Sequence, residues 1–135
     1  MSEAKIRQLF ESAVYDANFG VDIAYENVSY TPKTNKTYIQ VTLIPHDTFT
    51  NTLKGSEHTA FVGLFQIKIV VSENTGVDET NSLVSKIRET FPTDTLFTDG
   101  NFWVQVVSPL NVTSGRSQDG IHTTPCYFEY RADSN

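Results

Sequence analysis

The segment from Phe61 to Val71 is the feature of this chain that most constrains its fold. Every second residue in it is apolar or glycine: Phe61, Gly63, Phe65, Ile67, Ile69 and Val71. The residues between them are mixed in polarity, so the pattern predicts a β-strand with one face on the core and one face partly exposed. Gly76 then ends a short connection, and apolar residues at helical spacing follow it. The chain must therefore place a helix directly after a long strand.

This second segment predicts an amphipathic helix that ends at Pro92. Its apolar stripe consists of Val77, Thr80, Leu83, Val84, Ile87 and Phe91. Asp78 and Glu79 fall in the first turn, and Lys86 and Arg88 fall near the last turn. These charges have the signs that the helix dipole favours at each end. Pro92 cannot continue the helix because it lacks a backbone donor.

The N-terminal segment predicts another amphipathic helix, from about Glu3 to Asn18. Its apolar positions recur at helical spacing: Ile6, Leu9, Phe10, Ala13, Val14 and Ala17. Gly20 follows as a natural terminator.

The remaining strands are expected in three places. Tyr38, Val41, Leu43 and Pro45 mark one strand with a partial two-residue period. Leu96–Phe97 and Phe102–Val107 flank an Asp99-Gly100 turn and predict a hairpin, and Cys126–Tyr130 closes the chain as a final strand. The order of elements predicts a single α+β domain over residues 1–135, with a mostly antiparallel sheet of about four to six strands and two main helices packed on it.

Two long polar segments, His46–Ala60 and Ser108–Thr124, show no apolar periodicity and are predicted to be loops. Loops of this length in compact domains are usually functional or mobile. An acidic domain with such loops and no catalytic signature is typical of an assembly component. Within them, Asp47–Thr59 and Val112–Thr123 are the candidates for partner contacts, on the basis of length and polarity.

Charge and cysteine content exclude several classes of protein. The net charge is −6 and no run of Lys or Arg occurs, which argues against a dedicated binder of nucleic acid and against sequence-specific recognition of it. Cys126 is the single cysteine and has no partner for an intrachain disulfide. No segment has the apolar length of a signal peptide or a membrane span, so we expect a cytosolic protein that does not contact a membrane.

The residues that could carry chemistry have simpler interpretations. His46, His58 and His122 lie in the polar segments without the spacing of metal ligands. Cys126 sits in an aromatic strand, where a small buried side chain is the usual role, and Trp103 suits core or interface packing. No phosphate loop, dinucleotide fingerprint or nucleophile elbow occurs. We therefore predict no catalytic, cofactor-binding or metal-binding residue, no cofactor and no enzyme.

One catalytic alternative remains at the sequence level. His46-Asp47 follows a strand, and Gln66-Ile67-Lys68 resembles the acid-x-Lys element of restriction-type nucleases, in which carboxylates hold a divalent ion. Gln66 replaces the usual Glu, and the basic surface that would bind DNA is missing. A polar pair on the solvent face of a strand is the simpler explanation of Gln66 and Lys68.

Seven segments follow the N-terminal helix in a particular order and spacing: Tyr25–Val28, Tyr30–Pro32, Tyr38–Pro45, Gly63–Ile67, Gly76–Val77, Ile87–Pro92 and Tyr127–Tyr130. In the helix and these segments the chain resembles the tail-terminator family of small proteins from long-tailed bacteriophages. The match spans nearly the whole chain. No single motif is very specific, and the order and spacing of the segments carry the resemblance.

The resemblance implies a structural role in the virion tail, with assembly in the host cytoplasm. Family members form a ring, typically a hexamer, on the last ring of tail-tube subunits, which ends polymerisation and presents a surface for the head connector. The expected partners are therefore other copies of this chain, the tail-tube protein and the head–tail connector protein. Another neck protein or a subunit related to the tail tube is the alternative within the same particle.

Overall fold

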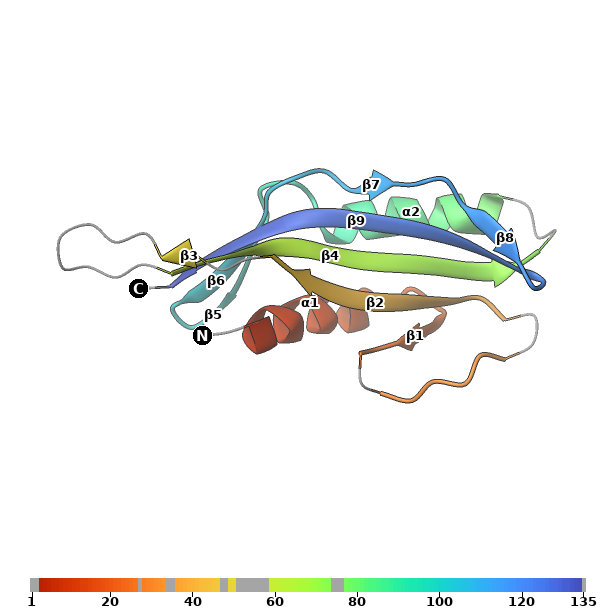
Figure 1. Ribbon diagram of the computed structural model, residues 1–135, viewed down its shortest axis with the longest axis horizontal. Helices are drawn as coiled ribbons and strands as arrows, with labels where there is room; N and C mark the ends of the chain where they lie inside the picture. Colours follow the sequence, from red (N-terminus) through yellow and green to blue (C-terminus); the bar gives the residue numbers. More distant parts are fainter. Residues whose placement is uncertain are drawn as a thin grey trace.

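Two long antiparallel strands, β4 (Thr59–Ser72) and β9 (Ile121–Ser134), form the centre of an elongated sheet in the computed structural model (Figure 1). They pair over their whole length, from Thr59 opposite Ser134 to Ser72 opposite Ile121. The structure describes residues 3–26, 28–33, 36–46, 49–50, 59–73 and 77–134. The strand predicted at 61–71 is confirmed, and it is longer at both ends than the apolar pattern indicates.

Shorter strands lie along both edges of this pair. On the β4 side they are β2 (Tyr38–Pro45) and β3 (Phe49–Thr50), with β1 (Asp22–Ala24) beside β2. On the β9 side they are β6 (Phe102–Val106), β7 (Asn111–Val112) and β8 (Arg116–Gln118), with β5 (Leu96–Asp99) beside β6. The main strand order is β1-β2-β4-β9-β6-β5.

The α+β class is confirmed, but the predicted sheet was too small and too uniform. The described part of the chain forms nine strands rather than about four to six, and β1 runs parallel to β2, so the sheet is mixed. The additional strands have only two or three residues. A segment this short shows no period of its own, and its conformation is set by hydrogen bonds to a long neighbour.

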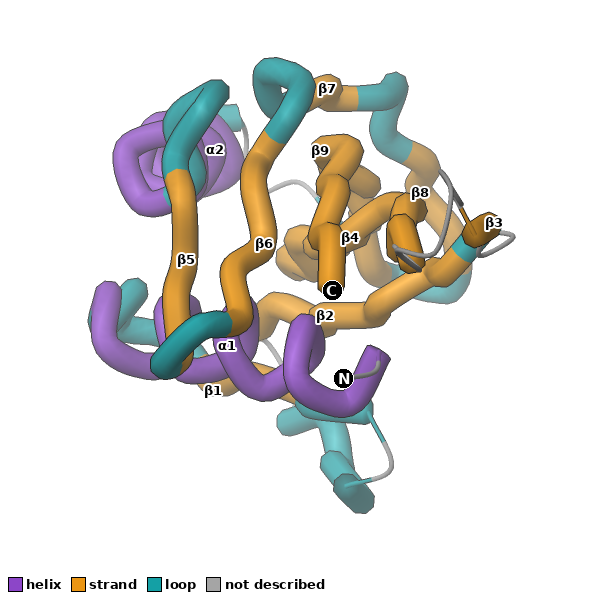
Figure 2. The backbone as a smooth tube through the Cα atoms, turned by 90° about the vertical axis from the view of Figure 1, so that its left-hand side faces the viewer, coloured by secondary structure: helices purple, strands orange, loops and turns teal. Residues whose placement is uncertain are grey.

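Both helices, α1 (Glu3–Ala17) and α2 (Asp78–Thr90), cover the same face of β2, β4 and β9, and the β5–β6 hairpin curls round on that side (Figure 2). Aromatic rings fill the space between the layers. The ring of Phe10 on α1 lies 4.9 Å from that of Phe65 on β4 and 5.3 Å from that of Phe128 on β9, between ring centroids. Phe91, directly after α2, packs 4.9 Å from Phe128. Aromatic residues from four segments therefore hold both helices to the sheet.

The predicted helical stripes are confirmed with one exception. On α1 the side chains of Ile6, Phe10 and Val14 are fully buried. Val77 was assigned to the apolar stripe of α2, and this was wrong. It is the residue that precedes the first helical turn and is 65% exposed, because the helix axis begins beyond it. The β5–β6 hairpin is confirmed around Gly100, whose φ of +63° suits glycine.

The two predicted loops were partly wrong. Within 46–60, β3 and the start of β4 pair with each other, and most of the remaining residues, including Asp47 and His58, lie outside the described residues. Within 108–124, β7, β8 and the first residues of β9 form part of the sheet. These segments show little apolar character because β7 and β8 are held in the sheet by hydrogen bonds to one long neighbour, β9, rather than by burial of an apolar face.

Candidate interaction surfaces

The residues considered for catalysis are not brought together. Gln66 and Lys68 lie on the partly exposed face of β4, opposite Thr42 and Gln40 of β2. His46, at the end of β2, is exposed. Among the described residues, no group of three or more His, Cys, Asp or Glu side chains is placed to hold a metal ion. Asp47, the carboxylate that the nuclease hypothesis requires, lies outside the described residues.

Cys126 is a core residue, as its aromatic surroundings predicted. Its side chain is fully buried on β9. Burial raises the pKa of the thiol to about 11, and the nearby Arg88 only partly opposes this shift. A thiol that keeps its proton at neutral pH is a poor nucleophile, so the environment suits packing.

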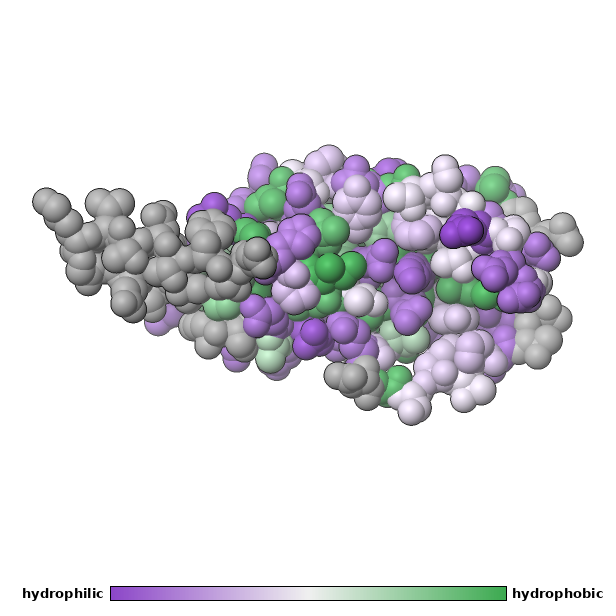
Figure 3. Space-filling model, in the orientation of Figure 1, coloured by the Kyte–Doolittle hydropathy of each residue, from purple (hydrophilic) through white to green (hydrophobic). Residues whose placement is uncertain are grey.

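The face of the sheet opposite the helices is open to solvent. Val62 and Leu64 of β4 and Ile44 of β2 point to this side and are each partly exposed. Figure 3 shows an apolar area in the middle of this face, over β4, with polar residues around it. Trp103 on β6 is also only partly buried.

A groove runs along the outer side of α1, and we call it the α1 groove. It has a volume of about 620 Å³ and is lined by Ala4, Arg7, Gln8, Glu11, Ser12, Tyr15, Asp16, Tyr25 and Val28. The α1 residues among them recur every three or four positions, so they share one side of the helix. Tyr15 is 72% exposed and Val28 is 61% exposed.

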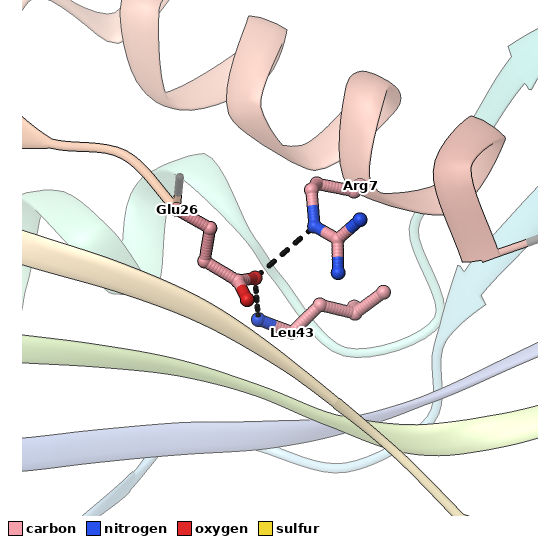
Figure 4. A network of polar contacts seen from close by, with 3 residues as sticks. All are labelled: Arg7, Glu26 and Leu43. Carbon is pink, nitrogen blue, oxygen red and sulfur yellow. Dashed lines mark hydrogen bonds and ion pairs between the residues drawn. The ribbon is translucent and has the colours of Figure 1, made fainter. Parts of the chain in front are cut away.

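The second wall of the α1 groove is formed by Tyr25 and Val28, and a polar network beside it joins Glu26 to α1 and β2 (Figure 4). The Nε of Arg7 donates to Oε1 of Glu26 over 3.1 Å, and the backbone N–H of Leu43 donates to the same oxygen over 2.7 Å. Pairing of β1 with β2 ends at Gln40, so in the described structure Glu26 takes the place of a strand partner for Leu43. This fixes the segment with Tyr25 against both α1 and β2.

The α1 groove carries negative charge. Burial raises the pKa of the Glu11 carboxyl, and the attraction of Arg7 opposes this shift less strongly. Arg7 is already engaged by Glu26. Burial also raises the pKa of Tyr25, and its hydroxyl has no hydrogen-bond partner among the described residues. The groove therefore combines exposed apolar side chains with Glu11 and Asp16.

A second hollow, the α2 cleft, lies between α2 and the strands β7, β8 and β9. Its volume is about 530 Å³, and its lining is Val71, Ser72, Val77, Thr80, Asn81, Val84, Arg88, Val112, Gly115, Ser117, His122 and Thr124. Nδ1 of His122 lies 2.9 Å from Oγ of Ser117. A Cβ at Gly115 would overlap the His122 ring, so glycine allows the chain to pass close over it. Val77 and Val112 are 65% and 41% exposed.

Sequence reasoning found only part of these surfaces. The segment Val112–Thr123, a candidate for partner contacts, supplies one wall of the α2 cleft, although as strands rather than as a loop. Nothing in the sequence pointed to Arg88, because a basic residue near the end of a helix has a sufficient local reason to be there. Tyr15 offered a signal, since it is an aromatic residue outside the apolar stripe of an amphipathic helix.

These features define a class of protein: a single mixed sheet with helices on one face, an open face opposite, and a hollow beside each helix. None of the described helices is long and apolar enough to cross a membrane. The sequence profile of the family described as "Phage tail terminator protein" matches residues 5–130. The chain belongs to this family, whose members are structural components of phage tails.

Solved structures share the fold. One, whose name carries no functional description, is 24% identical with a TM-score of 0.80, and the alignment covers 98% of this chain and 96% of that one. Another comes from a structure described as "Virion of native gene transfer agent (GTA) particle". It is 16% identical with a TM-score of 0.52, and the alignment covers 94% of this chain and 90% of that one. No curated protein matched the chain significantly.

Proposed function

We propose that this protein caps the phage tail tube as a closed ring of six subunits and so ends tail polymerisation. The observation that carries the proposal is the match of the tail terminator family over residues 5–130. The ring also presents the surface that joins the head. The partners are the tail-tube protein on one side and the head–tail connector protein on the other, with assembly in the host cytoplasm before incorporation into the virion.

Two observations support this proposal, the first for a ring and the second for a role in a virion. The α1 groove and the α2 cleft are different surfaces of one chain, and head-to-tail contact between two different surfaces generates a ring when the rotation closes. The fold is also that of a chain from a gene transfer agent virion. A capping ring needs one face complementary to the tube and another that cannot bind a further tube ring.

Tube length tests the proposal directly. The tail-tube protein of the same phage is assembled with and without this protein, and lengths are measured by electron microscopy. We expect tubes that stop growing, with this protein at one end, when it is present, and continued growth when it is absent. Unchanged growth in its presence would contradict the capping function.

Mass in solution separates the alternatives within the particle. Light scattering over a concentration series should give a discrete closed oligomer near six subunits that is indifferent to magnesium. Stacking into longer and longer assemblies would instead indicate a tube-related subunit. A protein that stays bound to the connector but never to the tube would be another neck component.

A further inference from the structure

Exposed apolar side chains gather in the two hollows. The described residues include seven large apolar side chains that are clearly exposed: Tyr15, Val28, Val77, Leu96, Val107, Val112 and Ile121. Tyr15 and Val28 line the α1 groove, and Val77 and Val112 line the α2 cleft. Four of the seven residues therefore line these two surfaces, two in each. This distribution is expected if the surfaces are the two sides of one contact.

The two surfaces carry opposite charge. Glu11 and Asp16 line the α1 groove, and Arg7, the only Lys or Arg among its described lining residues, is paired with Glu26. Arg88 is the only Lys, Arg, Asp or Glu among the described residues that line the α2 cleft, and within the described part of the chain no ion pair or hydrogen bond engages it. Complementary charge of this kind orients a docking partner and fixes its register.

Shape and position fit contact between successive copies. In Figure 1, α1 lies below and α2 above the central strands, and the α1 groove and the α2 cleft share no lining residue, so they are separate surfaces of one chain. Tyr15 projects from α1 with 72% of its surface exposed. The α2 cleft, about 530 Å³ in volume, is large enough to receive an aromatic ring. Tyrosine is among the residues that most often anchor an interface.

We infer that Tyr15 of one copy inserts into the α2 cleft of the next copy, between Val77 and Val112, where Arg88 pairs with Asp16. This inference names the subunit contact of the ring and so rests on the function proposed above. A second copy suits the cleft better than an unrelated partner, because this same chain supplies both the matching charge and the exposed aromatic side chain.

Substitution of the anchor is the first test. Tyr15→Ala removes the inserted ring and should weaken self-association by about tenfold or more in sedimentation analysis. Leu96→Ala is the matched control, since Leu96 is 54% exposed but lines neither hollow, and it should associate like the unaltered protein. Equal effects of the two substitutions would overturn the inference.

Charge reversal tests the pairing. Arg88→Glu should weaken association by about tenfold, and combining it with Asp16→Arg should restore most of the loss. Arg116→Glu is the matched control, because Arg116 is an exposed arginine on β8 that does not line the cleft. Absence of rescue, or an equal effect of Arg116→Glu, would overturn the pairing.

Cross-linking shows whether the surfaces meet, even in a weak complex. A tagged Ser12→Cys chain is mixed with an untagged Val77→Cys chain and treated with a short bismaleimide. The control reaction mixes Ser12→Cys with Leu96→Cys. The mixed dimer of Ser12→Cys and Val77→Cys should form about tenfold faster than the control dimer. Cys126 is fully buried and does not compete.

The outcomes separate this contact from the capping function. A closed oligomer without the cross-link, or no cross-link at any concentration, overturns the inference, and the tube-length assay then decides the function by itself. Cross-linking of the Val77→Cys chain to the tube protein instead of to Ser12→Cys also overturns it. A strong mixed cross-link with uncapped tubes supports the contact and contradicts the proposed function.

Discussion

The two faces of the sheet differ in what they do for the molecule. The face under the helices is filled by aromatic rings, among them Phe10, Phe65 and Phe128, which are fully buried. The opposite face keeps Val62, Leu64 and Ile44 partly exposed. The covered face therefore determines whether the chain folds, whereas the open face can change with little effect on the stability of the single chain.

The sharpest test of this difference is a pair of truncations on the two faces. Phe10→Ala should lower the free energy of unfolding by about 3–5 kcal/mol, because Phe10 contacts rings from the sheet and from the end of α2. Leu64→Ala on the open face should cost only about 1 kcal/mol. Urea unfolding measures both, and equal losses would contradict the division between the faces.

Gly63→Ala tests how tightly the covered face is packed. A Cβ at this position would lie 2.5 Å from the carbonyl oxygen of Ile44 and 2.7 Å from the hydroxyl oxygen of Tyr130. We expect a loss of roughly 1–3 kcal/mol in unfolding free energy. Tyr130→Phe removes one of these two atoms and should recover part of the loss in the double variant. Full additivity of the two changes would show that the hydroxyl is not the obstacle.

Glu26→Ala tests the join between the covered face and the α1 groove. It leaves the amide of Leu43 and the guanidinium of Arg7 without their shared acceptor, which should cost about 1–2 kcal/mol. Glu26→Gln keeps an oxygen acceptor and should lose less. Protection of the Leu43 amide from hydrogen exchange gives a local readout, and unchanged protection in Glu26→Ala would argue against the bond.

Alkaline pH should destabilise the covered face. Burial raises the pKa of Cys126 from 9.0 to about 11 and that of Tyr130 from 10.0 to about 12. Between these values the unfolded chain loses protons that the folded chain retains, so stability falls as pH rises from about 9 to 12. Below this range neither group contributes to the pH dependence of stability. Unfolding midpoints should decline less steeply for Cys126→Ala and Tyr130→Phe than for the unaltered protein.

The sequence predicted the elements whose pattern is long enough to repeat. Both helices, the strand at 61–71 and the hairpin around Gly100 each carry their own period or turn residue. Strands β7 and β8 do not, because two or three polar residues become strand only beside a long neighbour. The extension of β9 back to Ile121 has the same cause, since β4 and β8 supply its hydrogen-bond partners.

The hollows could not be predicted because they depend on which segments become neighbours. Val77 looked like a core residue of α2 until the start of the helix placed it outside the core. Arg88 and His122 are far apart in sequence and line one cleft only through the path of β8 and β9. Family membership, in contrast, was evident from the order and spacing of segments along the chain.

The hydrogen bond from Leu43 to Glu26 has a consequence for the behaviour of many copies at close quarters. An unpaired sheet edge offers its amides to any extended chain nearby, and this is a common route to aggregation. Here a carboxylate occupies the amide at the point where β1 stops. A negatively charged side chain at that edge repels a further strand as well as denying it a donor. The residue that joins the Tyr25 segment to α1 and β2 therefore also helps to prevent neighbouring copies from pairing through their backbones.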